Sequence, residues 1–124
     1  MSRKVLIVDD EDDIREVAAL SLESVAGWQV VTASSGAEAI RRAQEEKPDA
    51  ILLDVMMPVM DGPTTFRQMQ ANPELAAIPV LLLTAKVQAS DQRAFADLGV
   101  RAVLSKPFDP MQLASKIAFV LGWS

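Results

Sequence analysis

The sequence predicts a single α/β domain in which a five-stranded parallel sheet is covered by helices on both faces. Its 124 residues contain short apolar runs, such as 5–8 and 50–53, which are typical of strands buried on both sides. Between these runs, apolar residues recur at helical spacing. Five such strands alternate with five helices through brief connections, which indicates right-handed crossovers and a compact doubly wound sheet.

The first half of the chain has three predicted strands and two predicted helices. The strands are expected at 5–8, 28–32 and 50–53. Apolar residues at helical spacing predict a first helix over about 14–25, and Gly27 marks its end. Ser35 followed by Glu38 predicts a capping box that opens the second helix, which Pro48 closes.

Proline and glycine residues delimit the next two helices. Pro63 suits a first helical position, and this third helix is expected to end near Asn72-Pro73. A strand over 78–83 follows. A shorter helix is then predicted over about 90–98, with Gly99 as its end.

A brief strand at 102–104 precedes the last helix. Asp109 is the predicted N-cap of that helix, and Pro110 lies in its first turn. Phe108 and Leu113 flank the cap as a predicted hydrophobic staple. These signals place the start of the fifth helix at about residue 110.

The composition limits the possible functions. Half of the residues are hydrophobic, which suffices for one folded core. The formal net charge of −5 disfavours a nucleic-acid-binding surface. The absence of cysteine excludes disulfides and thiolate metal sites and favours a reducing compartment. Only four apolar residues separate Lys4 from Asp9, too few for a signal peptide or a membrane span, so a cytoplasmic protein is expected.

Groups that can bind a cation or a phosphate follow four of the five predicted strands. They are Asp9 and Asp10 after the first, Asp54 after the third, Thr84 after the fourth and Lys106 after the fifth. Because the carboxyl ends of parallel strands share one edge of a sheet, these groups are expected to converge. Each alone has an ordinary explanation, as a helix cap, a strand residue or a solvated lysine. Their coincidence favours a site.

Three clustered carboxylates raise one another's pKa values unless a cation lies among them. Oxygen ligands without histidine or cysteine favour Mg²⁺, or Mn²⁺ in its place. Mg²⁺ uses one or two carboxylates together with phosphate oxygens, which leaves the strand-terminal Asp54 as a nucleophile towards phosphorus. Lys106 and Thr84 would then hold the remaining phosphoryl oxygens.

Four motifs follow one another along the chain: Val8-Asp9-Asp10-Glu11, Asp54-Val55-Met56-Met57-Pro58 with Asp61-Gly62, Thr84-Ala85, and Lys106-Pro107-Phe108. Together they resemble the receiver domain of two-component response regulators, in the family's order and across the whole chain. The resemblance is closest in kind to the free-standing chemotaxis-type regulator. It implies a flavodoxin-like sheet with strand order 2-1-3-4-5 and a receiver domain over residues 1–124.

The resemblance also assigns the ligands of the cation. Asp54 is the implied phosphoacceptor, and it receives its phosphoryl group from a histidine kinase or a histidine phosphotransfer protein. Asp10, Asp54 and the backbone carbonyl of Met56 are the implied Mg²⁺ ligands. Asp9 is implied to contribute through a water molecule.

The same resemblance implies two residues that respond to the phosphoryl group and one departure from the family. Thr84 would contact the phosphoryl group and move on activation, and Lys106 would pair with it. The Lys106-Pro107 bond is expected to be cis. The family usually has an aromatic residue or a histidine three positions before the lysine, where this chain has Val103. Val103 is either a modified switch residue or simply a strand residue of the core.

The implied function is a signalling switch and not a turnover enzyme. The face formed by the fourth helix, the last strand and the fifth helix would bind an unknown downstream protein. Phe95 and Trp123 are candidate exposed anchors on that face, or else each belongs to the core or to a frayed end. Met56 and Lys86 would flank the phosphoryl group, and neither can orient a water well, so slow self-dephosphorylation is expected. The alternative is that both side chains point to solvent and change little.

Two other functions stay open. A phosphohydrolase with an aspartyl-phosphate intermediate would need a second acid two residues after the nucleophile, where this chain has Met56. A small-molecule module of the flavodoxin kind would need a phosphate-binding loop after the first strand. There, Asp9-Asp10-Glu11 would repel phosphate unless a cation intervened. A switch acquires one stable phosphoryl group, whereas an enzyme releases product repeatedly.

The chain ends one turn past the fifth predicted helix, at Gly122-Trp123-Ser124, without a DNA-binding or catalytic segment. The initial Met1 and the absence of a tag favour a free-standing regulator over a piece of a longer protein. Contacts with nucleic acid or a membrane are not expected, and the chain is expected to be a monomer or a weak homodimer.

Overall fold

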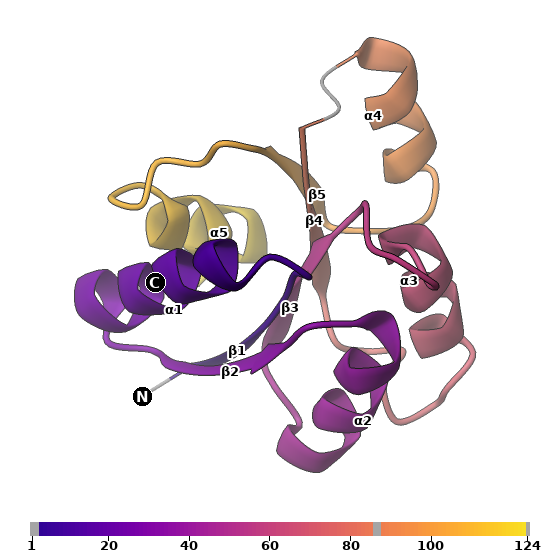
Figure 1. The fold of residues 1–124 in the computed structure, drawn as a ribbon, viewed down its shortest axis with the longest axis horizontal. Coiled ribbons are helices and arrows are strands. Elements are labelled where there is room, and N and C mark those ends of the chain that lie inside the picture. The colour runs from indigo at the N-terminus through magenta and orange to yellow at the C-terminus, as the bar shows by residue number, and fades with distance from the viewer. Residues whose placement is uncertain (1–2, 86–87, 124) are drawn as a thin grey trace.

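The computed structural model describes residues 3–85 and 88–123, and within them five strands alternate with five helices (Figure 1). The strands are β1 (Lys4–Val8), β2 (Gln29–Ala33), β3 (Ala50–Asp54), β4 (Val80–Thr84) and β5 (Ala102–Ser105). The helices are α1 (Asp12–Ala26), α2 (Gly36–Glu46), α3 (Gly62–Gln70), α4 (Ala89–Ala96) and α5 (Leu113–Leu121). All strand pairs are parallel, in the order β2-β1-β3-β4-β5. The predicted doubly wound fold and the implied strand order are both confirmed.

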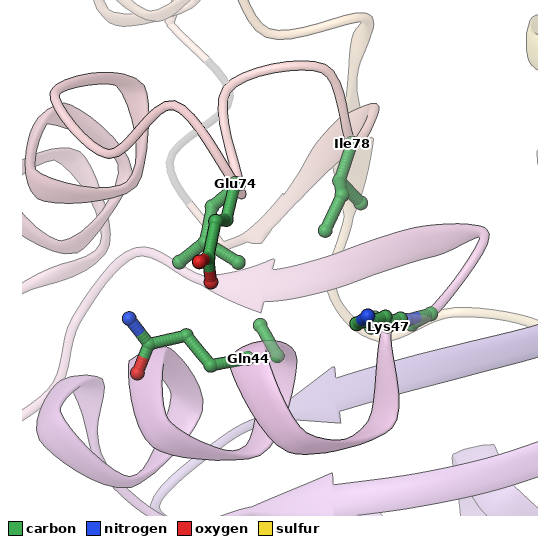
Figure 2. Close-up of a pocket in the computed structure, with 7 residues that line it drawn as sticks. Gln44, Lys47, Glu74 and Ile78 are labelled. Carbon is green, nitrogen blue, oxygen red and sulfur yellow. The ribbon is translucent and has the colours of Figure 1, made fainter.

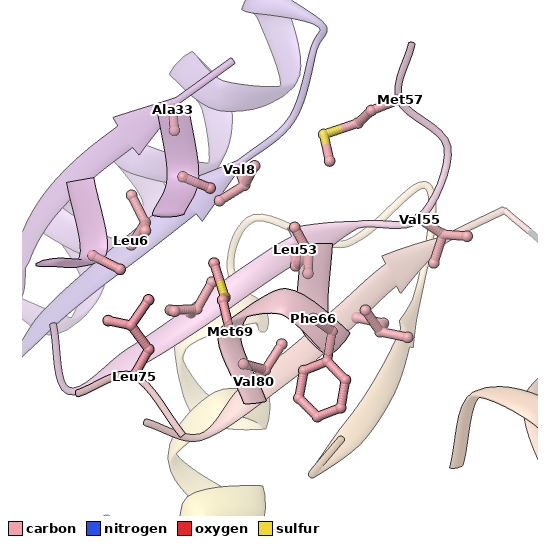
Figure 3. Packing of buried hydrophobic residues seen from close by; sticks show 14 of the residues in the cluster. Leu6, Val8, Ala33, Leu53, Val55, Met57, Phe66, Met69, Leu75 and Val80 are labelled. Carbon is pink, nitrogen blue, oxygen red and sulfur yellow. The ribbon is translucent and has the colours of Figure 1, made fainter. Parts of the chain in front are cut away.

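Helices cover both faces of the sheet, and each face has its own hydrophobic cluster. Figure 1 shows α1 and α5 together on one face, with α2, α3 and α4 on the other. Leu22 of α1 and Ile117 of α5 belong to the first cluster. Figure 3 shows the second cluster, in which Leu53, Phe66 and Met69 pack between β3 and α3.

The central strand β3 is buried on both sides, as its uninterrupted apolar run predicts. Ile51 and Leu53 belong to the cluster beneath α2, α3 and α4, whereas Leu52 belongs to the cluster beneath α1 and α5. None of these three residues is more than 1 % exposed. Because full burial of such a side chain contributes about 1.5–3 kcal/mol, this strand firmly fixes its last residue, Asp54.

The caps of α1 and α2 follow the sequence signals, with one shift. Gly27 ends α1 at a φ of 70°. At the start of α2, the Ser35 side chain accepts a hydrogen bond from the Glu38 amide over 3.1 Å. The Glu38 carboxylate, however, accepts from the amide of Ser34 over 2.6 Å, and not from the amide of Ser35 as a capping box requires. This bond from Ser34 is the main reason that the pKa of Glu38 is lowered.

The α3 helix begins one residue earlier than predicted. Asp61 is its N-cap, and the Asp61 carboxylate accepts from the Thr64 amide over 2.8 Å. That bond is the main cause of the lowered pKa of Asp61. Gly62 is therefore the first helical residue, and Pro63 occupies the second position.

The start of α5 differs from the prediction. The helix begins at Leu113, and a turn precedes it. Asp109 caps that turn, because its carboxylate accepts from the Met111 amide over 2.9 Å and its carbonyl accepts from the amides of Gln112 and Leu113. The predicted capping residue is thus used, but the Asp109 bonds close a turn and the regular helix starts later.

Gly62 lies against the end of β3. Its amide donates to the Val55 carbonyl over 2.8 Å. A Cβ atom at this position would lie 2.4 Å from the Asp54 carbonyl oxygen and 2.9 Å from the Val55 Cα. These are backbone atoms, which cannot rotate away as a side chain can.

We therefore expect Gly62→Ala to lower the free energy of unfolding by about 1–3 kcal/mol, as overpacking does elsewhere. Urea denaturation measures this change. Gln68→Ala, at an exposed position of the same helix, is the control, and it should stay within about 0.5 kcal/mol of the natural protein. A Gly62→Ala protein as stable as the Gln68→Ala control would contradict the close contact.

Candidate functional site

Four of the predicted site residues lie at the carboxyl edge of the sheet. Asp9 follows β1, Asp54 and Thr84 end β3 and β4, and Lys106 follows β5. The Lys106 ammonium lies 2.8 Å from Asp9 Oδ2 and 3.1 Å from Asp54 Oδ1. Thr84 is tied to this group through the backbone, since the Lys106 amide donates to the Thr84 carbonyl over 2.9 Å. The fold thus brings these predicted site residues to one place.

The three carboxylates differ in how far they are buried. Asp9 and Asp54 are 0 % and 4 % exposed, whereas Asp10 is exposed to solvent. Each of the three residues offers a carboxylate oxygen, and these oxygens lie within 4.8 Å of one another. The acidic cluster, Asp9, Asp10 and Asp54, therefore has two buried members and one that faces solvent.

The polar atoms of Asp9 are held on several sides. Its amide donates to the Ala33 carbonyl of β2 over 3.1 Å, and its Oδ1 accepts from the Glu11 amide over 2.9 Å. Its carbonyl accepts from the Arg15 guanidinium over 2.7 Å. Arg15 is not among the predicted site residues, because in the sequence it looks like an ordinary residue of the first helix.

The electrostatics of the site follow from this burial. Burial raises the pKa of Asp54 from 3.8 to about 6, the negative charge of Asp9 adds to this effect, and Lys106 opposes it. Burial lowers the pKa of Lys106, but its contacts with Asp9 and Asp54 outweigh this, so the net pKa is raised. At neutral pH the site therefore holds a charged lysine and an ionised Asp54.

The residues at this edge fit a hard divalent cation. Three carboxylates are the donor set that Mg²⁺ accepts, and neither histidine nor cysteine is present. Asp9 Oδ2 is buried, and among the described residues it has an ion pair with Lys106 but no hydrogen bond. A single ammonium thus offsets only part of the charge of the acidic cluster, and a cation would complete the compensation.

The residues implied to flank the phosphoryl group are only partly described. The Met56 side chain is 65 % exposed beside the site. Lys86 lies outside the described residues. The Lys106-Pro107 bond is cis, as expected.

The two predicted anchor residues are not exposed. Phe95 is only 9 % exposed and belongs to the core cluster beneath α2, α3 and α4, so the alternative of a core residue is the one that holds. Trp123 is half-buried, with its ring 5.1 Å from that of Trp28 and 4.7 Å from the Arg3 guanidinium. Both aromatic residues are held by partners that are distant in the sequence, which spacing along a helix does not reveal.

Val103 is a half-buried residue of β5 that packs against the core cluster containing Phe95. This favours the interpretation of Val103 as a strand residue. Phe119, in contrast, is 86 % exposed and is the large aromatic side chain that α5 presents to solvent.

Two further features lie away from the acidic edge. A pocket of about 370 Å³ lies at the amino ends of β3 and β4, where it is lined by Gln44, Lys47, Glu74 and Ile78 (Figure 2). No member of the acidic cluster lines it. Among the described helices, none combines the length and the apolar character that crossing a membrane requires.

The fold and the acidic edge define the class of protein. The structure superimposes on the chemotaxis protein CheY4 of Vibrio cholerae with a TM-score of 0.89 at 33 % identity, covering 97 % of this chain and 99 % of that one. The signal receiver domain of a signal transduction histidine kinase from Syntrophus aciditrophicus gives a TM-score of 0.85 at 33 % identity, covering 98 % and 91 %. The architecture is that of a signal receiver.

The family model for the response regulator receiver domain matches residues 5–118. The chain belongs to the response regulator receiver family of two-component systems.

Relatives in this family include transcriptional regulators. The alkaline phosphatase synthesis transcriptional regulatory protein PhoP of Bacillus subtilis is 38 % identical over 121 residues, which cover 98 % of this chain and 49 % of that protein. The transcriptional regulatory protein GltR of Pseudomonas aeruginosa is 37 % identical over 119 residues, covering 96 % and 49 %. The chain spans about half the length of these relatives. They are regulators and not turnover enzymes.

The raised pKa of Asp54 leads to a prediction about stability. The pKa of Asp54 in the folded protein lies above its ordinary value, so the cost of ionising Asp54 develops between pH 3.8 and about pH 6 and is fully present above that. In the presence of a chelator at pH 7.5, Asp54→Asn should raise the free energy of unfolding by about 1–3 kcal/mol. The gain should shrink as the pH falls towards 4, because Asp54 of the natural protein then becomes protonated.

Denaturation curves of both proteins between pH 4.5 and 7.5 measure this difference. Asp97→Asn, at the exposed end of α4, is the matched control and should change stability little at any pH. An Asp54→Asn protein that is less stable than the natural one at pH 7.5 would show that the Lys106 contact outweighs the cost of burial.

Proposed function

We propose that this chain is a phosphorylation-controlled switch in which Asp54 accepts a phosphoryl group from the phosphohistidine of a histidine kinase or a histidine phosphotransfer protein. The observation that carries this proposal is the meeting of the acidic cluster with Lys106 at the carboxyl edge of the sheet. The chain has no histidine, so the phosphorylated imidazole must come from the partner. The family membership supports a partner of this kind.

In the proposed reaction, a carboxylate oxygen of Asp54 attacks the phosphorus atom. A P–O bond to Asp54 forms while the P–N bond to the partner's imidazole breaks, and the imidazole leaves with its electron pair and takes up a proton. Although burial raises the pKa of Asp54 to about 6, this pKa still lies below neutral pH, so the carboxylate is mostly ionised there, as the attack requires. Burial also makes this carboxylate more basic than an ordinary aspartate.

Asp10, Asp54 and the backbone carbonyl of Met56 would hold Mg²⁺, or Mn²⁺ in its place, with Asp9 contributing through water. A bound Mg²⁺ supplies charge compensation for the carboxylates and for the phosphoryl oxygens. The exposed Asp10 makes no hydrogen bond or ion pair with the described residues, so its carboxylate is available as a ligand.

Lys106 and Thr84 would hold the phosphoryl group after transfer. The Lys106 ammonium already lies 3.1 Å from Asp54, so a short movement brings it to a phosphoryl oxygen. Thr84 ends β4, the strand next to β3, and its hydroxyl would donate to a second oxygen. These contacts stabilise the transferred charge.

A turnover enzyme is the weaker alternative. The position two residues after Asp54, where a phosphohydrolase would need its second acid, holds the exposed Met56. A thioether can neither donate nor accept the proton that such a reaction moves. This chemistry supports one stable phosphoryl group per chain.

Incubation with a small phosphodonor such as acetyl phosphate and Mg²⁺ should add one phosphoryl group to the natural protein, as measured by intact mass. Asp54→Asn should gain none, because the nucleophile is gone, and a chelator should abolish labelling of the natural protein. Asp97→Asn keeps the same loss of charge away from the site, so it should label normally. Labelling of Asp54→Asn at the natural rate would disprove the assignment.

We further propose that the face formed by α4, β5 and α5 carries the signal to a downstream protein. Thr84 ends the strand that leads to α4, and Lys106 directly follows β5, so both residues expected to contact the phosphoryl group border this face. Phe95 is the one buried residue of α4, which leaves that helix lightly attached. Phe95 also lines a pocket of about 550 Å³ with Met56 and Met57, so α4 lies next to the loop that follows Asp54.

On phosphorylation, the amide shifts of residues 88–121 should change more than those of α1 and α2. The physical reason is that Thr84 and Lys106 move towards the phosphoryl oxygens and displace the elements attached to them. Heteronuclear NMR spectra with and without phosphodonor measure the change, and Asp54→Asn with phosphodonor is the control. Shift changes confined to α1 and α2 would refute this assignment of the face.

The net charge of −5 supports a protein partner in place of nucleic acid, and a monomeric or weakly dimeric chain.

A further inference from the structure

Arg15 of α1 contacts the backbone beside the acidic cluster. Its Nη1 donates to the carbonyl oxygen of Asp9 over 2.7 Å, while its Nη2 forms an ion pair with Asp12, three residues earlier on the helix. The Arg15 side chain is only 18 % exposed. The guanidinium is therefore held in one place by α1 and reaches the end of β1.

The Asp9 carbonyl needs such a partner. The pairing of β1 with both of its neighbours ends at Val8, so the carbonyl of Asp9 lies beyond the sheet ladder. Asp9 is fully buried, and a buried carbonyl without a hydrogen bond carries a free-energy cost. Arg15 supplies the bond that a further strand residue would otherwise have supplied.

The same bond fixes the position of Asp10. The Asp9 carbonyl and the Asp10 amide belong to one planar peptide group, so holding the carbonyl orients the backbone at Asp10. The Asp10 carboxylate itself has no hydrogen bond or ion pair with the described residues. Its place within 4.8 Å of the other two carboxylates therefore depends on the backbone alone.

We propose that Arg15 is a positioning residue for the cation site, which orients the Asp9–Asp10 peptide and thereby holds the Asp10 carboxylate in the acidic cluster. This inference rests on the proposed function, because it concerns the same Mg²⁺ site. Arg15 touches neither the cation nor the phosphoryl group. It acts through the peptide that carries one of the ligands, as partners of metal ligands do elsewhere.

A role of Arg15 through its charge and a role in positioning Asp10 predict opposite changes in Mg²⁺ affinity when Arg15 is removed. A guanidinium near three carboxylates repels a divalent cation, so its removal should tighten Mg²⁺ binding if Arg15 acts only through its charge. If Arg15 positions Asp10, its removal should weaken Mg²⁺ binding, because the loop can then leave the arrangement in which the carboxylates lie together. The sign of the change therefore identifies the role.

The experiment is a calorimetric Mg²⁺ titration of the full chain, with no phosphodonor present. Arg15→Met keeps the aliphatic stem and removes the donors, and we expect it to raise the Mg²⁺ dissociation constant about tenfold. Arg15→Lys keeps the charge and one N–H donor group, and we expect it to recover part of the affinity. In the metal-free protein, the amide shift of Asp10 should change in Arg15→Met, while thermal denaturation shows that the fold is retained.

Arg101→Met is the matched control, since it removes the same charge from the residue directly before β5. This residue lies at the amino ends of the strands, on the side of the sheet away from the acidic cluster. The variant should bind Mg²⁺ as the natural protein does. If Arg15→Met fails to fold, Arg15→Gln carries the same expectation, because its amide is too short to reach the Asp9 carbonyl.

The outcomes separate this inference from the proposed function. If the natural protein binds Mg²⁺ and is phosphorylated at Asp54, while loss of Arg15 leaves binding unchanged or tightens it, only the role of Arg15 is overturned. If the natural protein binds no Mg²⁺, the proposed function and this inference both fail. The positioning role is supported if Arg15→Met binds Mg²⁺ more weakly than the natural protein and Arg15→Lys recovers part of the affinity. Arg101→Met should then bind Mg²⁺ as tightly as the natural protein.

Discussion

The contact of one lysine with two buried carboxylates is the interaction on which the acidic edge depends. β1 and β3 are neighbours in a parallel sheet, so Asp9 and Asp54 must lie side by side with little water to separate their charges. Lys106 comes from β5, on the far side of β4, and its side chain reaches across to both carboxylates. A buried pair of acids without that ammonium would be costly, because desolvation and mutual repulsion act in the same direction. The edge strand β5, which has no fully buried residue of its own, is therefore tied to the centre of the sheet by charge.

Much of the fold could be predicted because the strongest patterns come from burial on both faces of the sheet. The runs that became β1, β3 and β4 are apolar without interruption, and so short a run is typical of a strand that is buried on both faces. Helix starts were harder to predict. Glu38 bonds to the amide of Ser34 and not to that of Ser35, and Asp109 closes a turn before α5. Such choices between neighbouring amides depend on local geometry, which residue types alone do not determine.

The candidate site could be predicted to the extent that it depends on strand ends. Asp9, Asp54 and Lys106 meet because parallel strands end at one edge, a consequence of topology that needs no knowledge of side-chain contacts. Arg15 could not be found in this way. The pairing of Arg15 with Asp12 looks like an ordinary helical ion pair. Its bond to the Asp9 carbonyl forms because α1 begins only a few residues after β1 ends, which brings Arg15 close to the end of the strand. Phe95 shows the same limit, since only the packing of α4 against the sheet buries it.

The acidic edge also shows why stability and function conflict in this protein. A fold selected for stability alone would not bury an ionised Asp54 beside Asp9, and the raised pKa of Asp54 measures that cost. The same cost makes the site responsive, because any group that adds charge there changes the balance among the contacts of Lys106. A cation would reduce the need of the carboxylates for the lysine, and a phosphoryl group would offer it new oxygens. Since Lys106 directly follows β5 and its amide is bonded to Thr84, a redistribution of its contacts must act on the ends of β4 and β5. A change of charge at the carboxyl edge of the sheet can thus act through the backbone on β5 and α4, which are the least buried strand and helix of the fold.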